Sequence, residues 1–261
     1  MYKWGILYGL IFMVSCLGQA QIPHGHAHND YKQQHPLIDA LNLGYGSVEV
    51  DVFSHKGSIH VAHTKFGLPF SKTLEELYLD PLVNWLDKHD DQFYSLDNPL
   101  VLMIDLKSNH EVLIQSLEEL LIQYADYLVR QEAGLIIPGL VQIVLSGGVS
   151  AELLENQTTG FLFGDCPMKL FYYPSDDCIW CVRRSSAWSY WFSWKGKGQI
   201  SEIELQLLHD LVSDAHLAGY KLRFWAIPDT EACWDLLLDS GVDWINVDDL
   251  DRFGVFYQNR D

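Results

Sequence analysis

Two kinds of hydrophobic segment alternate along the chain. Short segments that alternate apolar and polar residues, or that are almost continuously apolar, predict strands, because successive side chains of a strand point to opposite faces. The predicted strands are IPHGHAH (22–28), SVEVDVF (47–53), PLVLMIDLK (99–107), LVQIVLSGG (140–148), GFLFG (160–164), KLFYY (169–173), KLRFWAI (221–227) and VDWINV (242–247). The segment KGSIHVAH (56–63) is expected to pair with the second of these strands as a hairpin.

Longer segments with apolar residues three and four positions apart predict amphipathic helices. They cover residues 36–44, 71–89 (with a break at Pro81), 110–131, 149–157, 200–219 and 229–241. The aromatic-rich residues 175–198 fit neither pattern. Strand and helix alternate close to eight times, which predicts an α/β protein with a TIM-type (β/α)8 barrel of ~250 residues. A doubly wound open sheet is the alternative, but no GxGxxG motif follows the first strand.

The first twenty residues, MYKWGILYGLIFMVSCLGQA, have the pattern of a secretory signal peptide. Lys3 precedes an apolar run, and small residues allow cleavage after Ala20. The apolar run is shorter than the ~20 residues that span a bilayer. We therefore expect a signal peptide over residues 1–20, one barrel domain over residues 21–261, and an exported protein that is periplasmic or secreted. A membrane anchor, or a lipid attached at Cys16, is the alternative.

Charge and cysteine content limit the classes of partner. The chain has 35 acidic and 17 basic residues, a formal net charge of −18. Such a surface repels a phosphate backbone, so nucleic acid is not an expected substrate, and close docking on anionic lipid is disfavoured. Cys178 and Cys181 have CxxC spacing, but Cys166 and Cys233 stand alone, so a zinc site lacks its second pair. Disulfides or buried thiols are expected instead.

Polar side chains gather at the carboxyl ends of the predicted strands, where (β/α)8 barrels carry their active sites. They are His28, Asn29, Glu49, Asp51, His63, Asp105, Lys107, Asn246 and Asp248. Glu49 and Asp51 lie two apart on one strand, so both face the barrel interior while the intervening valines face the helices. Carboxylates that share one cavity repel each other unless a cation lies between them.

We therefore predict a site for a divalent metal, Ca²⁺ or Mg²⁺, with Glu49, Asp51 and Asp105 as its ligands. Asn29 can add a neutral carbonyl oxygen. The alternative is that these carboxylates form a solvated strand face, or that Asp105 simply pairs with Lys107 or an arginine.

Three histidines, His24, His26 and His28, alternate on the first strand and share one face. His28 lies nearest the mouth of the barrel, so the two deeper ones are expected to be structural or to support the site. Two histidines beside a metal suit phosphodiester cleavage: one removes a proton from the attacking hydroxyl, and the other protonates the leaving oxygen. We predict His28 and His63 for these roles, and Lys107 for binding a phosphate oxygen.

Four blocks, in this order, resemble the superfamily of glycerophosphodiester phosphodiesterases and phosphatidylinositol-specific phospholipases C. The blocks are AHNDY (27–31), GYGSVEVDVFSHKGSIHVAH (44–63), VLMIDLK (101–107) and RFWAIPDTEACWDLLLDSGVDWINVDD (223–249). The resemblance implies a phospholipase-C-like phosphodiesterase barrel with a divalent metal at its mouth. It also implies that His28 and His63 form the acid–base pair and that the three carboxylates bind the metal.

Two departures from the family pattern point to an atypical branch. Glycerophosphodiesterases usually have His-Arg where this chain has His28-Asn29. The His-Asn pair is similar to that of metal-dependent eukaryotic phospholipases C, in which the asparagine is a metal ligand. Asp105 stands where a glutamate is more usual and reaches one methylene less, so it can act through a water molecule.

The expected function is that of an exported, metal-dependent phosphodiesterase acting on a small-molecule or lipid-derived phosphodiester, glycerophosphodiester-like or phosphoinositide-like. Attack by water and attack by a neighbouring substrate hydroxyl, which gives a cyclic phosphate, both stay open. One alternative is a non-catalytic envelope barrel that binds glycan or phosphate-bearing ligands, and another is an unrelated metal-dependent hydrolase. An aromatic cluster can serve as a substrate wall or as core: Trp188, Tyr190, Trp191, Phe192 and Trp194.

Overall fold

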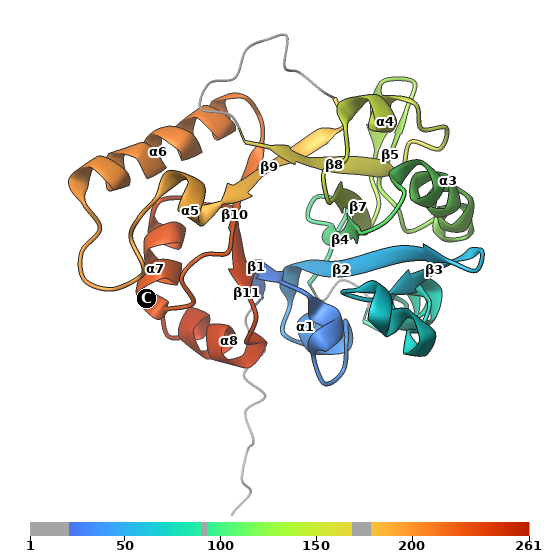
Figure 1. Ribbon diagram of the computed structural model, residues 1–261, viewed down its shortest axis with the longest axis horizontal. Helices are drawn as coiled ribbons and strands as arrows, with labels where there is room; N and C mark the ends of the chain where they lie inside the picture. Colours follow the sequence, from blue (N-terminus) through green and yellow to red (C-terminus); the bar gives the residue numbers. More distant parts are fainter. Residues whose placement is uncertain (1–20, 90–92, 169–178, 261) are drawn as a thin grey trace, which may run out of the picture.

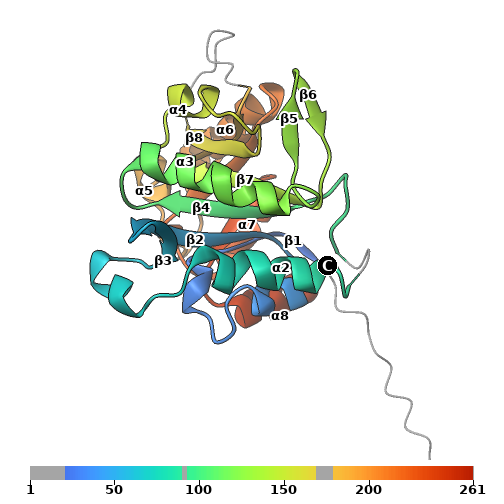
Figure 2. The ribbon, with the colours of Figure 1, turned by 90° about the vertical axis from the view of Figure 1, so that its right-hand side faces the viewer.

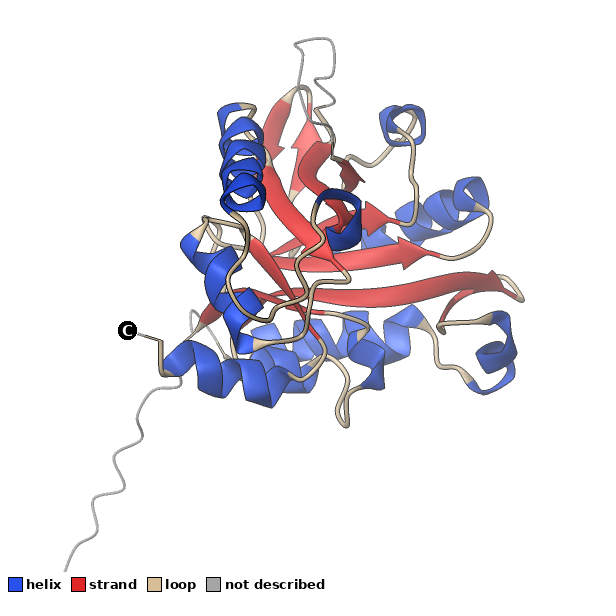
Figure 3. Cartoon of the chain, turned by 60° about the vertical axis from the view of Figure 1, so that its left-hand side comes forward, coloured by secondary structure: helices blue, strands red, loops and turns tan. Residues whose placement is uncertain are grey.

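Eight parallel strands close into a barrel (Figures 1 and 3) in the computed structural model, which describes residues 21–89, 93–168 and 179–260. The strand order is β1-β11-β10-β9-β8-β7-β4-β2, and a further pairing of β1 with β2 closes the ring. The barrel strands are β1 (Ile22–Ala27), β2 (Tyr45–His55), β4 (Leu100–Leu106), β7 (Val141–Ser146), β8 (Leu162–Pro167), β9 (Cys181–Ala187), β10 (Lys221–Trp225) and β11 (Trp244–Val247). The predicted (β/α)8 barrel is confirmed, and the open sheet is excluded.

Helices surround the barrel on its outer side (Figure 3). They are α1 (Ile38–Asn42), α2 (Asp80–Leu86), α3 (His110–Leu121), α4 (Ala151–Glu155), α5 (Trp188–Trp191), α6 (Glu202–Leu217), α7 (Glu231–Asp239) and α8 (Leu250–Gln258). A π-helical segment, η3 (Glu75–Leu79), runs into α2, so Pro81 stands in the first turn of α2 where the two helical segments meet. None of the helices in the described ranges is long and apolar enough to cross a bilayer.

The alternation along β2 divides its side chains between two environments. Val48, Val50 and Val52 are fully buried in the main hydrophobic core between the barrel and the helices. Glu49 and Asp51 point the other way, into the barrel, as the period of two requires. β2 also pairs with the antiparallel strand β3 (Ser58–Val61), which confirms the predicted hairpin.

Several regions differ from the sequence-based expectation, among them helix α8, which was not predicted. Helix α3 ends at Leu121 rather than near residue 131, because the following backbone turns to the sheet, where the Val129 N–H donates to the Val141 carbonyl (2.8 Å). Residues 130–137 form a small antiparallel pair, β5 (Arg130–Glu132) and β6 (Leu135–Ile137). The unassigned aromatic region contains β9 and α5. The predicted strand over residues 169–173 lies outside the described residues.

One disulfide joins Cys166 of β8 to Cys181 of β9, with Cα atoms 5.8 Å apart. Cys181 therefore does not pair within the CxxC motif; Cys178 lies outside the described residues. Cys233 is a buried free thiol. Disulfides or buried thiols were expected, and the described residues contain one of each. Residues 1–20, for which a signal peptide is predicted, and Cys16 among them, also lie outside the described residues.

Candidate functional site

The predicted site residues meet at one cavity of about 1120 Å³ at the carboxyl ends of the barrel strands. That volume is at or slightly above the ~300–1,000 Å³ of typical small-molecule pockets. Six of the seven predicted residues line it: His28, Asn29, Glu49, His63, Asp105 and Lys107. The seventh, Asp51, does not line the cavity: it is fully buried, and it contacts His63 and Lys107. The structure therefore brings together residues from four separate segments of the chain.

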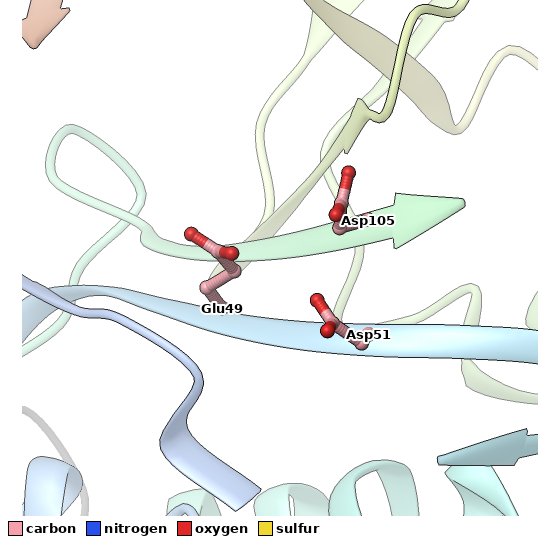
Figure 4. Close-up of side chains that lie close together, drawn as sticks. All are labelled: Glu49, Asp51 and Asp105. Atoms are coloured by element: carbon pink, nitrogen blue, oxygen red, sulfur yellow. The ribbon is translucent and has the colours of Figure 1, made fainter. Parts of the chain in front are cut away.

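Three carboxylates converge within this cavity (Figure 4). Glu49, Asp51 and Asp105 each offer an oxygen, and these oxygens all lie within 4.8 Å of one another. The strand register sets this arrangement, because Asp51 of β2 stands directly beside Asp105 of β4. Burial raises the pKa of Asp51 above its usual value, and hydrogen bonds from His63 and Tyr31 partly offset that effect.

Some of the carboxylate oxygens lack a hydrogen-bond partner among the described residues. Asp51 Oδ1 is buried without a hydrogen bond, although the Lys107 ammonium lies 3.4 Å away, and Glu49 Oε1 accepts no hydrogen bond, lying 3.9 Å from His28 Nε2. Buried, unsatisfied carboxylate oxygens are unfavourable unless a cation or water completes their coordination. Three hard oxygen donors at this spacing fit a divalent cation such as Ca²⁺ or Mg²⁺.

The Lys107 ammonium contacts the same carboxylates. It forms an ion pair with Asp105 and lies 3.4 Å from Asp51 Oδ1. Burial alone lowers the pKa of Lys107, but the hydrogen bond and the negative charges of Asp105 and Asp51 outweigh burial and raise it. Lys107 is therefore cationic and stands at the pocket wall, where its predicted role towards a phosphate oxygen stays a prediction.

Asp248 and Asn29 fix the orientation of His28. Nδ1 of His28 lies 2.7 Å from Asp248 Oδ1, and the Asn29 amide N–H donates to Nε2 (2.8 Å). This pattern fits the tautomer in which the Nδ1–H donates to Asp248 and Nε2 accepts the Asn29 N–H. The hydrogen bond from His28 lowers the pKa of Asp248. Nε2 becomes available to accept a proton when the Asn29 N–H turns away from it.

The second histidine, His63, is oriented by Asp51. Its Nδ1 lies 2.7 Å from Asp51 Oδ2, and its Nε2 forms no hydrogen bond with the described residues. Tyr31 links the two histidines, because its hydroxyl contacts Asn29 Oδ1 (2.5 Å), Asp51 Oδ2 (2.7 Å) and His63 Nδ1 (3.1 Å). Burial and the hydrogen bond to Asp51 raise the pKa of Tyr31, so the hydroxyl keeps its proton.

A network of buried polar side chains holds one oxygen of Glu49, Oε2, in place. Arg223 Nη1 donates to Glu49 Oε2 (3.2 Å) and to Asn246 Oδ1 (2.9 Å), while Nη2 donates to Asp165 Oδ2 (3.1 Å). His26 Nε2 lies 2.8 Å from the same Glu49 oxygen. Burial and the Arg223 charge lower the pKa of His26, and its Nε2 lies beside both Glu49 Oε2 and Arg223 Nη1 (3.0 Å). His26 is thus a buried, hydrogen-bonded histidine, whereas His24 is exposed, and among the described residues its ring forms a hydrogen bond with the Asp243 carbonyl (3.1 Å).

Asp105 is positioned by the end of β7. Ser146 Oγ donates to Asp105 Oδ1 (2.8 Å), and the next residue is Gly147 with a φ of +89°. A Cβ atom at Gly147 would stand 2.8 Å from Asp105 Oδ1 and 2.6 Å from the Leu106 carbonyl oxygen. Glycine is therefore needed here both for its backbone conformation and for the space that the carboxylate occupies.

The aromatic cluster divides between core and pocket. Trp188 and Phe192 stack with ring centroids 4.0 Å apart in the buried core. Tyr190 and Trp191 line the cavity together with Trp225 of β10. Sequence reasoning missed Tyr31, Asp165 and Arg223 as parts of the site. The only signals were the polar positions among otherwise apolar strand residues and the place of Tyr31 within the AHNDY block.

Comparison with known proteins gives the family. Residues 18–165, more than half of the chain, match the model of the AIM6-like phosphodiesterase domain. The chain belongs to the AIM6-like phosphodiesterase family. All of the predicted site residues fall inside this matched region.

Fungal relatives of this AIM6-like protein are similar over most of its length. It is 29% identical to the "Altered inheritance of mitochondria protein 6" of Eremothecium gossypii over 88% of this chain and 68% of that protein. Identity is 27% with the same-named protein of Saccharomyces cerevisiae, over 86% and 68% of the two chains. It is 25% with the homologue of Arthroderma benhamiae, over 86% and 81%. These names describe no chemical reaction.

Among solved structures, a glycerophosphodiester phosphodiesterase from Agrobacterium tumefaciens is similar with a TM-score of 0.45 and 14% identity. The match covers 83% of this chain and 89% of that one.

Proposed function

We propose that this AIM6-like protein is an exported, metal-dependent phosphodiesterase that cleaves a glycerophosphodiester-like or phosphoinositide-like phosphodiester. The observation that supports this most strongly is the convergence of three carboxylates between two separately oriented histidines at one cavity. The family match supports the general reaction class. Export is supported by the signal-peptide pattern and by the disulfide between β8 and β9, since disulfides persist in oxidising compartments.

Glu49, Asp51 and Asp105 would hold the metal, with Asn29 as a further oxygen ligand. A bound divalent cation would neutralise charge on the phosphoryl oxygens and lower the pKa of an attacking hydroxyl. Asn29 lines the same cavity, and its backbone adopts the left-handed conformation (φ 50°), which asparagine tolerates better than most residues. The Arg223 network offsets part of the negative charge of Glu49 and keeps its second oxygen directed to the site.

The two histidines would move the protons of the reaction. His28 Nε2 accepts the proton of the attacking hydroxyl while that oxygen forms its bond to phosphorus. His63 gives a proton to the leaving alcohol oxygen as its bond to phosphorus breaks. With water as the attacking group the products are a phosphomonoester and an alcohol. With a neighbouring substrate hydroxyl they are a cyclic phosphodiester and an alcohol. Lys107 would bind a phosphoryl oxygen.

Replacement of either histidine tests these roles. We expect His28→Ala and His63→Ala each to lower kcat by about 10²–10⁴-fold, the usual contribution of general acid–base catalysis. Circular dichroism should show an unchanged fold, because both side chains line the cavity and neither belongs to the hydrophobic core. The matched control is His35→Ala, which removes an exposed imidazole outside the cavity and should leave kcat unchanged. Wild-type turnover in either site variant would remove that histidine from the mechanism.

A substrate screen separates catalysis from ligand binding. Purified protein is incubated with glycerophosphodiesters and phosphoinositides in the presence of Ca²⁺ or Mg²⁺, and products are followed by phosphorus NMR. Release of a phosphomonoester or of a cyclic phosphate supports the proposal and identifies the attacking group. Retention of a ligand without any product would instead favour a binding barrel, for which the aromatic wall of Tyr190, Trp191 and Trp225 is the relevant surface.

A further inference from the structure

Two phenylalanines project from the turn η2 (Lys65–Phe70), which begins two residues after His63. Their exposed fractions are 94% for Phe66 and 93% for Phe70, the highest of any large hydrophobic residue in the described ranges. Single exposed apolar side chains are common on soluble proteins. A pair of almost fully exposed aromatic rings on one short turn is a different feature, because each ring presents roughly 150–250 Å² of surface.

The backbone of this turn is fixed to the barrel. The Val61 N–H donates to the Lys72 carbonyl (2.9 Å), which closes the segment between them. The Ser71 hydroxyl donates to the Leu68 carbonyl (2.9 Å), and His60 Nδ1 lies 3.0 Å from the same hydroxyl oxygen. The two rings are therefore held outward by an ordered turn.

The charge of this segment is opposite to that of the protein. Residues 52–74 contain no Asp or Glu, although the chain has 35 acidic residues. The same stretch contains Lys56, Lys65 and Lys72, all exposed and none in an ion pair with the described residues. Lysines that flank exposed aromatic residues are typical of segments that bind the interface of anionic membranes, where each basic residue adds attraction to the lipid surface.

The position of the segment relates it to the candidate site. β2 pairs with β4 up to Val52 and then continues to His55, so the β2–β3 hairpin extends past the carboxyl end of the barrel. Figure 1 shows the β2–β3 hairpin extending past the neighbouring barrel strands, and Figure 2 shows the turn that follows it, in cyan, at the edge of the molecule. His63 lines the cavity and is two residues from the start of the turn.

We propose that Phe66, Phe70 and the three lysines form a docking surface for an anionic lipid bilayer, and that the substrate is a membrane phospholipid. The two rings together present about 300–500 Å² of apolar surface. This is less than the ~800 Å² per partner of a standard protein interface, but it is sufficient to anchor the segment in a bilayer. The overall negative charge disfavours close docking of the rest of the surface, so contact is limited to this segment. The substrate class rests on the proposed function, whereas the docking does not.

Vesicle binding tests the docking. Purified protein is sedimented with vesicles of phosphatidylcholine alone and of phosphatidylcholine mixed equally with phosphatidylglycerol. We expect binding to the mixed vesicles, with partitioning lowered at least about tenfold by the double substitution Phe66→Ser/Phe70→Ser. Lys65→Gln/Lys72→Gln should remove the preference for the anionic mixture. The control is Ile203→Ser/Leu217→Ser on α6, which removes two side chains of 83% and 84% exposure and should change nothing.

Three results would overturn the docking proposal: no binding of the wild type, equal loss in the control variant, or a dimer in sedimentation analysis that Phe66→Ser/Phe70→Ser converts to a monomer. The last result would assign the rings to a contact between copies of the chain.

A paired activity assay separates this proposal from the proposed function. Turnover of a phospholipid in the mixed vesicles is compared with turnover of the same headgroup diester without acyl chains. We expect Phe66→Ser/Phe70→Ser to lower the ratio of the two rates by about tenfold, in proportion to the lost partitioning. Cleavage of the soluble diester alone would reject the membrane substrate and keep the phosphodiesterase. Vesicle binding without cleavage of either compound would reject the phosphodiesterase and keep the docking surface.

Discussion

Asp248 is the residue on which the reactivity of His28 depends most directly. Its carboxylate holds Nδ1 of His28 at 2.7 Å and so keeps the acceptor nitrogen, Nε2, towards the cavity. Asp248→Asn removes the charge, and its amide N–H favours the opposite tautomer. We expect kcat to fall at least about tenfold with little change in KM, because the substitution disturbs proton transfer rather than binding.

Steady-state kinetics on the substrate found in the screen measure this effect. Asp97→Asn is the matched control, since Asp97 is exposed in a turn and forms no ion pair with the described residues. A variant at Asp248 that raised KM alone would show that this carboxylate binds substrate and does not orient His28.

A second carboxylate, Asp243, contributes to stability rather than to the site. It accepts hydrogen bonds from His216 Nε2 (2.8 Å) and the Leu222 N–H (2.8 Å), and Lys221 Nζ lies 3.0 Å away. Burial alone raises the pKa of Asp243, but these three partners outweigh burial and lower it below its usual 3.8.

Because the folded-state pKa is the lower one, the carboxylate stabilises the fold above about pH 4, and this contribution disappears as pH falls through the folded-state value. Asp243→Asn should therefore lower the free energy of unfolding by about 1–3 kcal/mol at pH 7, the range for a buried hydrogen-bonded charge. The difference from the wild type should shrink towards pH 3. Guanidinium unfolding at both pH values measures it, and a difference independent of pH would contradict the assigned ionisation.

At the scale of elements, the covalent link between β8 and β9 restrains the unfolded chain. Cys166 and Cys181 are 15 residues apart, and closing a loop of that length corresponds to about 3 kcal/mol of stability in the chain-entropy description. We expect reduction, or the double variant Cys166→Ala/Cys181→Ala, to lower the free energy of unfolding by about that amount. Urea unfolding with and without reductant measures the change. Reductant should not change the free energy of unfolding of the double variant any further. If reductant lowered it as much as in the wild type, the loss of stability would come from another cysteine.

The elements that the sequence predicted well are those whose side chains follow one period. In β2 and β4 the outward positions are aliphatic, so the pattern reveals both the strand and the inward direction of Glu49, Asp51 and Asp105. β9 was missed because it contains Arg183 and Arg184 at buried positions. Their guanidinium groups are accommodated by the rings of Trp244 (4.7 Å) and Tyr220 (4.1 Å), which come from distant segments.

The same distinction explains the site. The positions of Glu49, Asp51 and Asp105 could be predicted from the barrel alone, because parallel strands end at the same edge of the sheet. Tyr31 and Arg223 acquire their roles only from contacts between distant segments: Tyr31 with Asp51 and His63, and Arg223 with Glu49 and Asp165. Side-chain networks of this kind depend on strand register and on the closing of the barrel, neither of which has a local sequence signal.

At the scale of the whole molecule, the net charge of −18 conceals an uneven distribution. Three carboxylates meet inside the barrel, while the hairpin and turn beside its mouth have none. The sequence-based expectation that anionic lipid is disfavoured holds for the average surface, and the segment over residues 52–74 is where we propose an exception. A cation bound inside the barrel would reduce the negative field at the mouth and favour the approach of an anionic phosphodiester.

That cation should also stabilise the whole fold. An ion that binds the folded state alone adds about 2.7 kcal/mol at a concentration one hundred times its Kd, which for a domain of this size corresponds to about 5–10 °C in Tm. We expect Ca²⁺ or Mg²⁺ to raise Tm by that amount, and a chelator to reverse the shift and to stop turnover. Differential scanning calorimetry measures the shift.

Asp105→Asn should abolish or strongly reduce the shift, because it removes one of three carboxylates that converge within 4.8 Å, whereas Asp97→Asn should keep it. The variant is expected to fold, since the amide retains the shape of the side chain and relieves repulsion among the acids. The larger of the shifts produced by the two ions identifies the cation that the cavity prefers. A shift of equal size in Asp105→Asn would place the ion elsewhere on this acidic protein and remove the metal from the proposed chemistry.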